Sequence, residues 1–181
     1  MFDPSNIKFR TINKKDLKLI LYWRNSNFIR FKMLNQKKIL FKEHRAWFKN
    51  QKKNLKNKTF IICYNNNDIG VASINEIDRI NKTCTWGYYI AENKFRYLAF
   101  FVEYKLVDQI FNKINIRKIW GRTLVSNKRV LKIHNILGFK KEGLHKEHIK
   151  VKNKYEDVVL TSLFKKDWNK NKTKISRKFN I

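Results

Sequence analysis

The chain has 181 residues, of which 43% are hydrophobic and 14% aromatic, so it can form one domain with a core, and wholesale disorder is excluded. Five glycines and one proline exclude collagen-like and Pro/Gly-rich low-complexity chains. Lysine and arginine outnumber aspartate and glutamate by 42 to 14, and the resulting net charge of +28 attracts polyanions whatever the fold.

The pattern of apolar residues predicts a mixed α/β chain. Alternating segments predict strands, and segments with apolar residues every three or four positions predict helices. In chain order these are a strand at 7–12, helices at 13–25 and 36–50, antiparallel strands at 59–64, 69–77 and 83–90, a helix at 98–114, a strand at 117–125, a helix at 128–137, and strands near 139–149 and 155–165. This order predicts a single domain over 1–168, a sheet with helices on both faces. The basic segment 169–181 is expected to be a tail that is disordered in part.

The first predicted helix carries an arginine on its apolar face. Leu17, Ile20 and Leu21 lie on one face of the helix, and Arg24 follows on that face one further turn along. Arg24 is therefore expected at the inner, C-terminal end of the helix, where its guanidinium needs an anionic partner. A bound phosphate and a buried carboxylate such as Asp157 both meet that need, and both interpretations stay open.

The cysteines and the lack of long apolar stretches indicate an intracellular protein. Cys63 and Cys84 lie in strand-like segments without C-x-x-C spacing, so we interpret them as reduced core thiols and expect no metal site. Residues 1–10 lack the apolar run of a signal peptide, and no stretch approaches the roughly 18 apolar residues of a membrane span. We therefore expect a cytoplasmic protein with no membrane contact.

The most informative motif lies in the C-terminal half. Asn127 closes a predicted strand, His134 lies in the next helix, and residues 137–143 read LGFKKEG. Together they give the pattern N-x6-H-x2-L-G-F-x2-E-G. This pattern resembles the GNAT superfamily of N-acetyltransferases.

Five further segments resemble one branch of that superfamily more closely. This branch comprises the bacterial sugar-nucleotide N-acetyltransferases of the pseudaminic acid pathway, which acetylate the 4-amino group of UDP-4-amino-4,6-dideoxy-N-acetyl-β-L-altrosamine. The segments are WRN at 23–25, KEH at 42–44, WGYYI at 86–90, KEGLHKEHI at 141–149 and KYEDVVL at 154–160. The resemblance covers roughly residues 7–168, and its C-terminal half is shared with acetyltransferases of protein N-termini.

The resemblance implies a fold and a coenzyme. The GNAT fold is α/β, with one mixed, mostly antiparallel sheet of six or seven strands that splays after the fourth strand and has helices on both faces. Acetyl-CoA is the implied co-substrate, and its pantetheine arm enters the splayed opening along the main chain of Tyr88, Tyr89 and Ile90. Its pyrophosphate lies at the start of the next helix, where backbone N–H groups and the helix dipole favour anions. The remaining implied coenzyme contacts are Lys94, Arg96, Tyr97, Leu98, Ala99, Asn127 and His134.

One residue of the pyrophosphate loop departs from the superfamily. Tyr97 stands where glycine is usual. A residue other than glycine fits if its backbone stays at negative φ, and its side chain would then lie beside the phosphates. Lys94 and Arg96 offer positive charge to those phosphates.

Acetyl transfer to an amine needs a neutral amine, a stabilised oxyanion and a proton for the departing thiolate. The superfamily usually supplies that proton from a tyrosine, and His134 stands at the matching position, where an imidazole can do the same. The alternative is that His134 only packs and touches the coenzyme. Asn127 can bond the pantetheine arm or cap the following helix. No general base stands out: Glu76 can accept a proton or form a cross-strand salt bridge, and bulk water can suffice.

The resemblance also implies an acceptor site. Arg24 and His44 match residues that contact the nucleotide in the pseudaminic acid enzymes, and a guanidinium suits phosphate oxygens. The sugar-contacting strand matches Ser73, Asn75 and Tyr89. For His44, a satisfied half-buried histidine is an equal alternative.

We therefore expect an N-acetyltransferase that moves an acetyl group from acetyl-CoA to a UDP-linked amino sugar by direct transfer, with His134 as candidate acid. One alternative is acetylation of a protein N-terminus, such as that of a ribosomal protein. Another is a basic nucleic-acid-binding module with a degenerate coenzyme site. Because the positive charge is spread over all segments instead of one stripe, no specific nucleic-acid partner is expected. The oligomeric state is left open, a homodimer included.

Overall fold

The computed structural model describes residues 3–181, apart from the side chains of residues 52 and 53. One sheet of seven strands runs through the molecule in the order β1-β2-β3-β4-β5-β7-β6. The strands are β1 (Ile7–Thr11), β2 (Lys58–Tyr64), β3 (Asn67–Asp78), β4 (Thr83–Ile90), β5 (Lys118–Leu124), β6 (Lys140–Val151) and β7 (Lys154–Phe164). All neighbours are antiparallel except β4 and β5, which are parallel. The predicted mixed, mostly antiparallel sheet is confirmed.

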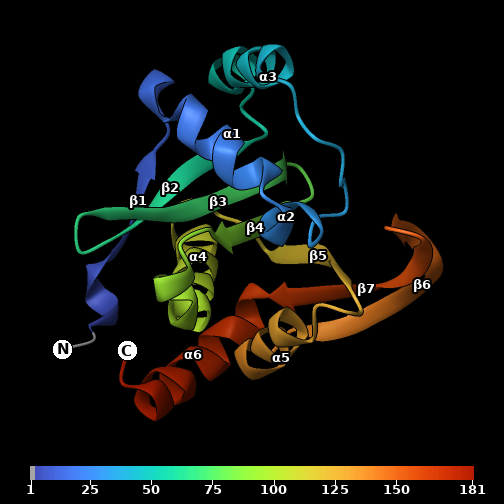
Figure 1. Cartoon of the computed structure of the whole chain (residues 1–181). Coiled ribbons are helices and arrows are strands. Elements are labelled where there is room, and N and C mark those ends of the chain that lie inside the picture. Colours follow the sequence, from blue (N-terminus) through green and yellow to red (C-terminus); the bar gives the residue numbers. More distant parts are fainter. Residues whose placement is uncertain (1–2) are drawn as a thin grey trace.

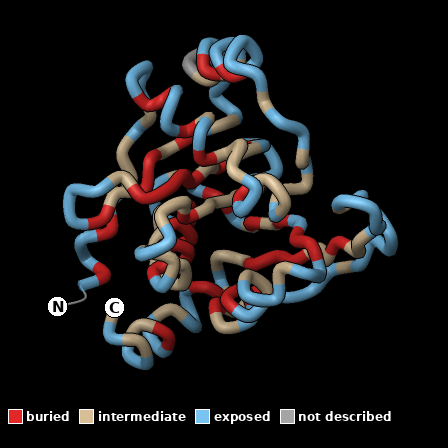
Figure 2. The backbone as a smooth tube through the Cα atoms, in the orientation of Figure 1, coloured by how far each residue is buried: buried red, intermediate tan, exposed pale blue. Residues whose placement is uncertain are grey.

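Helices lie on both faces of this sheet, as predicted (Figure 1). They are α1 (Leu17–Asn25), α2 (Asn27–Arg30), α3 (Phe41–Lys53), α4 (Ala99–Lys113), α5 (Lys128–Leu137) and α6 (Lys165–Phe179), with short 3-10 helices η1 (Pro4–Asn6), η2 (Lys14–Asp16) and η3 (Asn93–Leu98). Figure 2 shows the buried stretches concentrated in the central strands and in the helix faces packed on them.

Alternation along β2 explains why the molecule has two cores. Ile61 packs with Ile20 and Trp23 of α1 on one face of the sheet. Ile62, the next residue, belongs to a larger core on the other face, because successive side chains of a strand point to opposite faces. Helix α4 supplies that core with a fully buried row: Val102, Leu106, Val107, Ile110 and Phe111.

The second long helix begins later than the predicted residue 36. The Asn25 side chain holds the preceding segment extended, because its Nδ2 donates to Ile39 O at 2.8 Å and its Oδ1 accepts from Ile39 N at 2.8 Å. Helix α3 then starts at Phe41, where the Glu43 carboxylate accepts the Leu40 N–H at 2.8 Å. Apolar periodicity does not reveal side chains that bond the backbone at a helix start, so it predicted the start of this helix too early.

The C-terminal segment differs from the expectation of a partly disordered tail. Residues Lys165–Phe179 form α6, which buries Trp168 and Ile175 in the larger core. The Trp168 indole Nε1–H donates to Asp108 Oδ1 of α4 at 3.0 Å. The exposed face of α6 is basic, so the composition of this segment is similar to that of a disordered tail. Trp168 and Ile175, seven positions apart, nevertheless anchor the segment as a helix. Among the described residues, no helix is long and apolar enough to cross a membrane.

We expect the anchoring of α6 to contribute measurably to stability. Trp168 is completely buried, so Trp168→Ala should lower the free energy of unfolding by about 3–5 kcal/mol. Lys174→Ala, on the exposed side of the same helix, should change it by less than about 0.5 kcal/mol. Urea unfolding monitored by circular dichroism measures both, and equal stability of the two variants would show that α6 does not pack on the domain.

Candidate active site

The sheet opens between β4 and β5. These strands pair only through Thr83 with Lys118 and Cys84 with Ile119, at the start of both strands. Within the described chain no later residue of β4 pairs with β5, although β3 continues to pair with β4 as far as Ile90. One edge of β4 is therefore free of strand partners, and a cavity of about 390 Å³ lies beside it.

A glycine and a tryptophan shape the base of this opening. A Cβ atom added to Gly121 of β5 would lie 2.8 Å from Cζ3 of Trp86, so no larger residue fits there without displacing the ring. The Trp86 ring stacks on Phe139, with centroids 4.6 Å apart, and lies 5.3 Å from the His134 ring. Aromatic packing thus fills the space directly below the cavity.

A buried carboxylate ties three cavity-lining side chains together. Glu103 of α4 is completely buried, and its Oε1 accepts from Trp86 Nε1 at 3.3 Å and lies 2.9 Å from His134 Nε2. Its Oε2 accepts from the Tyr88 hydroxyl at 3.1 Å. Burial and the neighbouring Glu103 charge raise the pKa of Tyr88, so this hydroxyl remains a donor. Three partners offset the cost of burying this carboxylate.

Both ring nitrogens of His134 have neighbours. Nε2 faces Glu103, and Nδ1 lies 3.4 Å from Thr161 Oγ1 on β7. The side chain is buried but lines the cavity from α5. Both ring nitrogens are therefore near polar side chains, a carboxylate at Nε2 and a hydroxyl at Nδ1.

The cavity is strongly cationic. Its lining contains five basic side chains and no aspartate or glutamate among the residues that the structure describes. The five are Arg24, Lys32, Arg96, Arg122 and Arg129. An anionic ligand would therefore be favoured in the cavity and a cationic one disfavoured.

Arg24 lies at the inner end of α1, as its position in the helix predicts. One terminal nitrogen, Nη2, donates to Asn35 O at 2.5 Å, while Nη1 is buried with no hydrogen-bond partner among the described atoms. Burial lowers the pKa of Arg24, although the neighbouring Tyr89 opposes this shift. The alternative partner Asp157 instead accepts from the backbone N–H of Glu147 at 2.8 Å. Among the described residues, no carboxylate therefore pairs with the Arg24 guanidinium, which lines the cavity.

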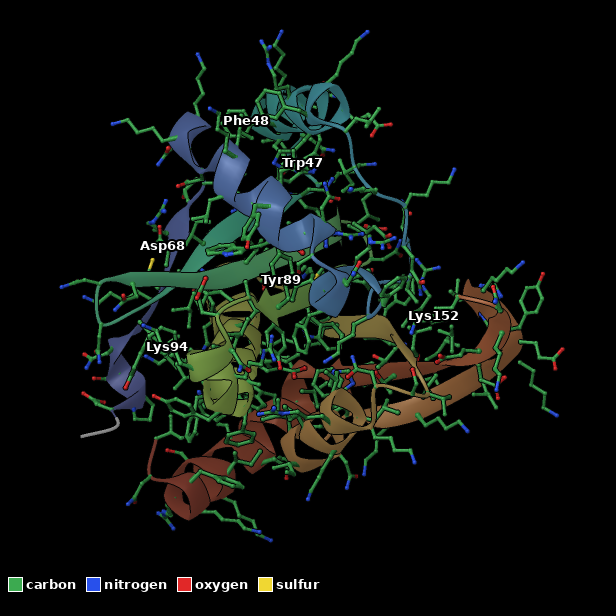
Figure 3. All side chains as sticks on the ribbon, viewed as in Figure 1. Trp47, Phe48, Asp68, Tyr89, Lys94 and Lys152 are labelled. Carbon is green, nitrogen blue, oxygen red and sulfur yellow. The ribbon has the colours of Figure 1, made fainter. Side chains whose placement is uncertain are left out.

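Nine of the residues expected at the site line this one cavity. They come from α1, β3, β4, η3, the start of α4, and α5 with its N-cap residue, and Tyr89 is labelled in Figure 3. The nine are Arg24, Ser73, Tyr88, Tyr89, Ile90, Arg96, Ala99, Asn127 and His134. The Asn127 side chain makes no capping bond to α5, so it can bond a ligand.

Five expected residues lie outside the cavity lining, and each has another environment. Leu98 is fully buried in the larger core, and Lys94 is exposed beside Phe95, 5.0 Å from its ring centroid (Figure 3). His44 is buried and stacks on Trp47, with ring centroids 4.9 Å apart. The other two are Asn75, whose Nδ2 donates to Ser73 Oγ at 3.0 Å, and Tyr97.

Tyr97 lies outside the cavity lining, although the sequence predicts it beside the coenzyme phosphates. Its side chain is 53% exposed, and partial desolvation together with the neighbouring Tyr64 hydroxyl raises the pKa of Tyr97. Its backbone is not at positive φ, which is the condition under which a residue other than glycine fits this loop. The candidate base Glu76 also lies outside the lining, in an exposed bulge at a φ of 53°.

Sequence reasoning missed three important residues, Glu103, Lys32 and Arg129. For Glu103 the signal was present, because this carboxylate shares the apolar stripe of its helix with Leu106, Val107 and Ile110. A charged residue on such a stripe indicates a buried polar network. Lys32 and Arg129 carried no comparable signal in a chain with 42 basic residues.

Comparison with known proteins identifies the family. The sequence profile described as "Acetyltransferase (GNAT) domain" matches residues 6–140, about three quarters of the chain. The chain belongs to the GNAT acetyltransferase family.

Two curated relatives of this GNAT chain come from Bacillus. The uncharacterized N-acetyltransferase p20 of Bacillus licheniformis is 32% identical over 55% of this chain and 57% of its own length. YdaF of Bacillus subtilis (strain 168), a candidate ribosomal N-acetyltransferase, is 24% identical over 59% of each chain. The match thus spans less than two thirds of either relative.

Solved structures share the fold of this GNAT chain. The spermidine N-acetyltransferase from Vibrio cholerae, in complex with CoA and spermine, superposes with a TM-score of 0.86 at 21% identity, covering 91% of this chain and 99% of that one. A dodecameric structure of the Vibrio cholerae enzyme in an intermediate state superposes with a TM-score of 0.78, also at 21% identity, over 91% of this chain and 96% of that one. At this identity the likeness establishes the fold alone.

The Glu103 network of this GNAT chain predicts a contrast between two substitutions. Glu103→Leu leaves the buried donors of Trp86, Tyr88 and His134 without a partner, so it should destabilise the fold by about 1–3 kcal/mol for each unsatisfied group. Glu103→Gln keeps a carbonyl oxygen and shape, and should cost clearly less. Urea unfolding of both variants measures the difference, and equal losses would mean that the hydrogen bonds do not matter.

Proposed function

We propose that the protein transfers the acetyl group of acetyl-CoA to the amino group of a nucleotide-linked sugar, such as a UDP-linked 4-amino sugar. The observation that carries this proposal is the charge of the cavity, which has five cationic side chains and no carboxylate in its described lining. Both proposed substrates carry several phosphates, and a positive cavity attracts such molecules and holds them.

The residues at the opening fit the coenzyme. The free edge of β4 offers main-chain N–H and C=O groups of Tyr88, Tyr89 and Ile90 to the amide groups of a pantetheine arm. On the opposite strand Gly121 accommodates the Trp86 ring at the base of the opening, and Arg96 lies where a pyrophosphate would approach the start of α4. This combination of an unpaired strand edge and a cation at a helix start supports acetyl-CoA as co-substrate.

Acetyl-CoA supplies a thioester, and in the transfer a C–N bond forms to the acceptor amine while the C–S bond breaks. The chain has to hold the amine and to return a proton to the thiolate. We assign the second task to His134, which lines the cavity between the Glu103 carboxylate at Nε2 and the Thr161 hydroxyl at Nδ1. Because the described lining of the cavity contains no carboxylate, water is proposed to take the proton from the acceptor ammonium group.

Arg24, Ser73 and Tyr89 are the residues proposed to hold the acceptor. Arg24 has a buried guanidinium nitrogen without a partner among the described atoms, and a guanidinium binds phosphate oxygens in bidentate fashion. Ser73 and Tyr89 offer hydroxyl groups from neighbouring strands to a sugar. The nucleotide and the sugar would thus lie side by side.

A polyamine fits this cavity poorly, although the structural neighbours include enzymes named for spermidine. Each aliphatic amine of a polyamine is protonated near neutral pH and requires carboxylates or carbonyl groups as partners. The described lining of this cavity offers cations in place of carboxylates. We therefore assign this chain a negatively charged acceptor.

A second candidate function is acetylation of a protein N-terminus, which the match to YdaF favours. Thermal unfolding with and without UDP separates the two. A nucleotide-sugar enzyme should be stabilised, by about 2.7 kcal/mol when UDP reaches a hundredfold excess over its dissociation constant. An unchanged midpoint at saturating UDP would favour the protein acceptor.

Arg24→Gln tests the acceptor assignment. We expect kcat/KM for a UDP-4-amino sugar to fall about tenfold to a hundredfold, because a charged hydrogen bond to phosphate is lost, while the affinity for CoA stays the same. Mass spectrometry of the acetylated product measures the rate, and Lys174→Gln on α6 is the matched control. If no UDP-4-amino sugar in a panel gains an acetyl group, the sugar assignment is wrong.

A further inference from the structure

Two cations of the cavity lie against one aromatic ring. The Lys32 Nζ lies 3.8 Å from the ring centroid of Phe28, and the Arg96 Cζ lies 3.2 Å from the same centroid. Phe28 belongs to α2 and Lys32 follows two residues after that helix ends, whereas Arg96 belongs to η3. A phenyl ring attracts each cation, so it brings together two like charges from distant parts of the chain.

Arg129 adds a third charge to this pair. Its Nη2 donates to the backbone carbonyl of Arg96 at 2.7 Å, which fixes the Arg129 side chain beside the loop before α4. Arg129 lies in the first turn of α5, so three separate segments contribute one cation each. All three side chains line the same cavity.

This arrangement lacks an anion. No ion pair joins Lys32, Arg96 or Arg129 to a carboxylate in the part of the chain that the structure describes, and Arg96 Nε is buried without a hydrogen-bond partner. Burial lowers the pKa of Lys32 and of Arg96, and the neighbouring cations lower both further. Uncompensated repulsion of this kind is relieved when an anion binds between the charges.

Most of the basic residues in this chain do not share these properties. Lys94 lies two residues before Arg96, yet it does not line the cavity. The cluster differs because one shared ring, Phe28, and the backbone carbonyl of Arg96 hold its three members beside one another. Guanidinium and ammonium groups that line one cavity can share the oxygens of a bound phosphate.

We infer that Lys32, Arg96 and Arg129 form one phosphate-binding cluster that joins the acceptor side of the cavity to the coenzyme side. The cluster deepens the proposed function, on which it rests for the identity of the ligand: a phosphate or pyrophosphate group of either the coenzyme or the nucleotide acceptor. Lys32 and Phe28 follow α1, which carries Arg24, so a phosphate bound by Lys32 also fixes the segment beside the acceptor.

Calorimetric titration of the full chain tests the cluster with four probes: CoA, dephospho-CoA, UDP and inorganic pyrophosphate. Lys32→Gln and Arg129→Gln each remove one exposed charge, so both should fold normally, and a thermal unfolding scan verifies this. We expect each substitution to lower the affinity for at least one phosphate probe about tenfold, since a hydrogen bond to a charged group is lost. Lys174→Gln, an equal loss of charge on α6, should leave every affinity unchanged.

The probes also identify the source of the phosphate. If the variants lose equal affinity for CoA and dephospho-CoA, the cluster binds the coenzyme pyrophosphate. If they lose affinity for CoA alone, it binds the 3′-phosphate of CoA. If they lose affinity for UDP alone, it binds the acceptor. The inference is overturned if the wild-type chain binds no phosphate probe or if neither variant binds any probe more weakly than the wild type. It is also overturned if Lys174→Gln lowers the affinities as much as the two variants do. A wild-type chain that binds pyrophosphate but neither form of CoA would refute the proposed function while the cluster is still tested.

Discussion

The site depends on the early separation of β4 and β5. Two residue pairs join the strands at their start. Beyond these pairs β4 and β5 diverge and form no further pairs with each other among the described residues. Aromatic side chains fill the wedge just below the opening, where Trp86 lies against Gly121 and stacks on Phe139. An unpaired strand edge exposes main-chain groups that need partners, and this is the kind of surface along which an extended ligand with amide groups can bind.

The buried carboxylate of Glu103 stabilises this divergence. A single side chain of α4 holds the indole of Trp86, the hydroxyl of Tyr88 and the imidazole of His134. Because these three side chains also line the cavity, the same hydrogen bonds that make the buried charge tolerable set the shape of the site. The core on this face and the candidate chemistry are therefore one connected structure.

The net charge of +28 had two different meanings in this chain. Many of the basic side chains, such as Lys94 and Lys174, are exposed and do not line the cavity. The cations that indicate a binding site are those whose side chains are held in place by the structure. They are Arg24, which has a buried guanidinium nitrogen, and Arg96, which packs against Phe28. Position and partners, and not number, separate a binding site from a basic surface.

Periodicity and motif spacing predicted the strands, most helices and the opening after β4, because these follow from local apolar patterns and from the family resemblance. The late start of α3 depends on the Asn25 side chain, which bonds a residue fourteen positions away, and such a contact is not readable from periodicity. Helix α6 was missed because its basic composition concealed two anchors. At the site, Arg24 was found from its helix face, whereas Lys32 and Arg129 required the fold to bring three segments together.

Hydrogen exchange along β4, with and without CoA, tests most directly whether the opening is the coenzyme site. The amide groups of residues 85–90 that β3 does not bond should exchange quickly in the free protein and become strongly protected when CoA binds. Protection should also rise at the start of α4, beside Arg96. If CoA binds but protects a different surface and leaves these β4 amides unchanged, the separation of β4 and β5 is not the coenzyme site and the account is wrong.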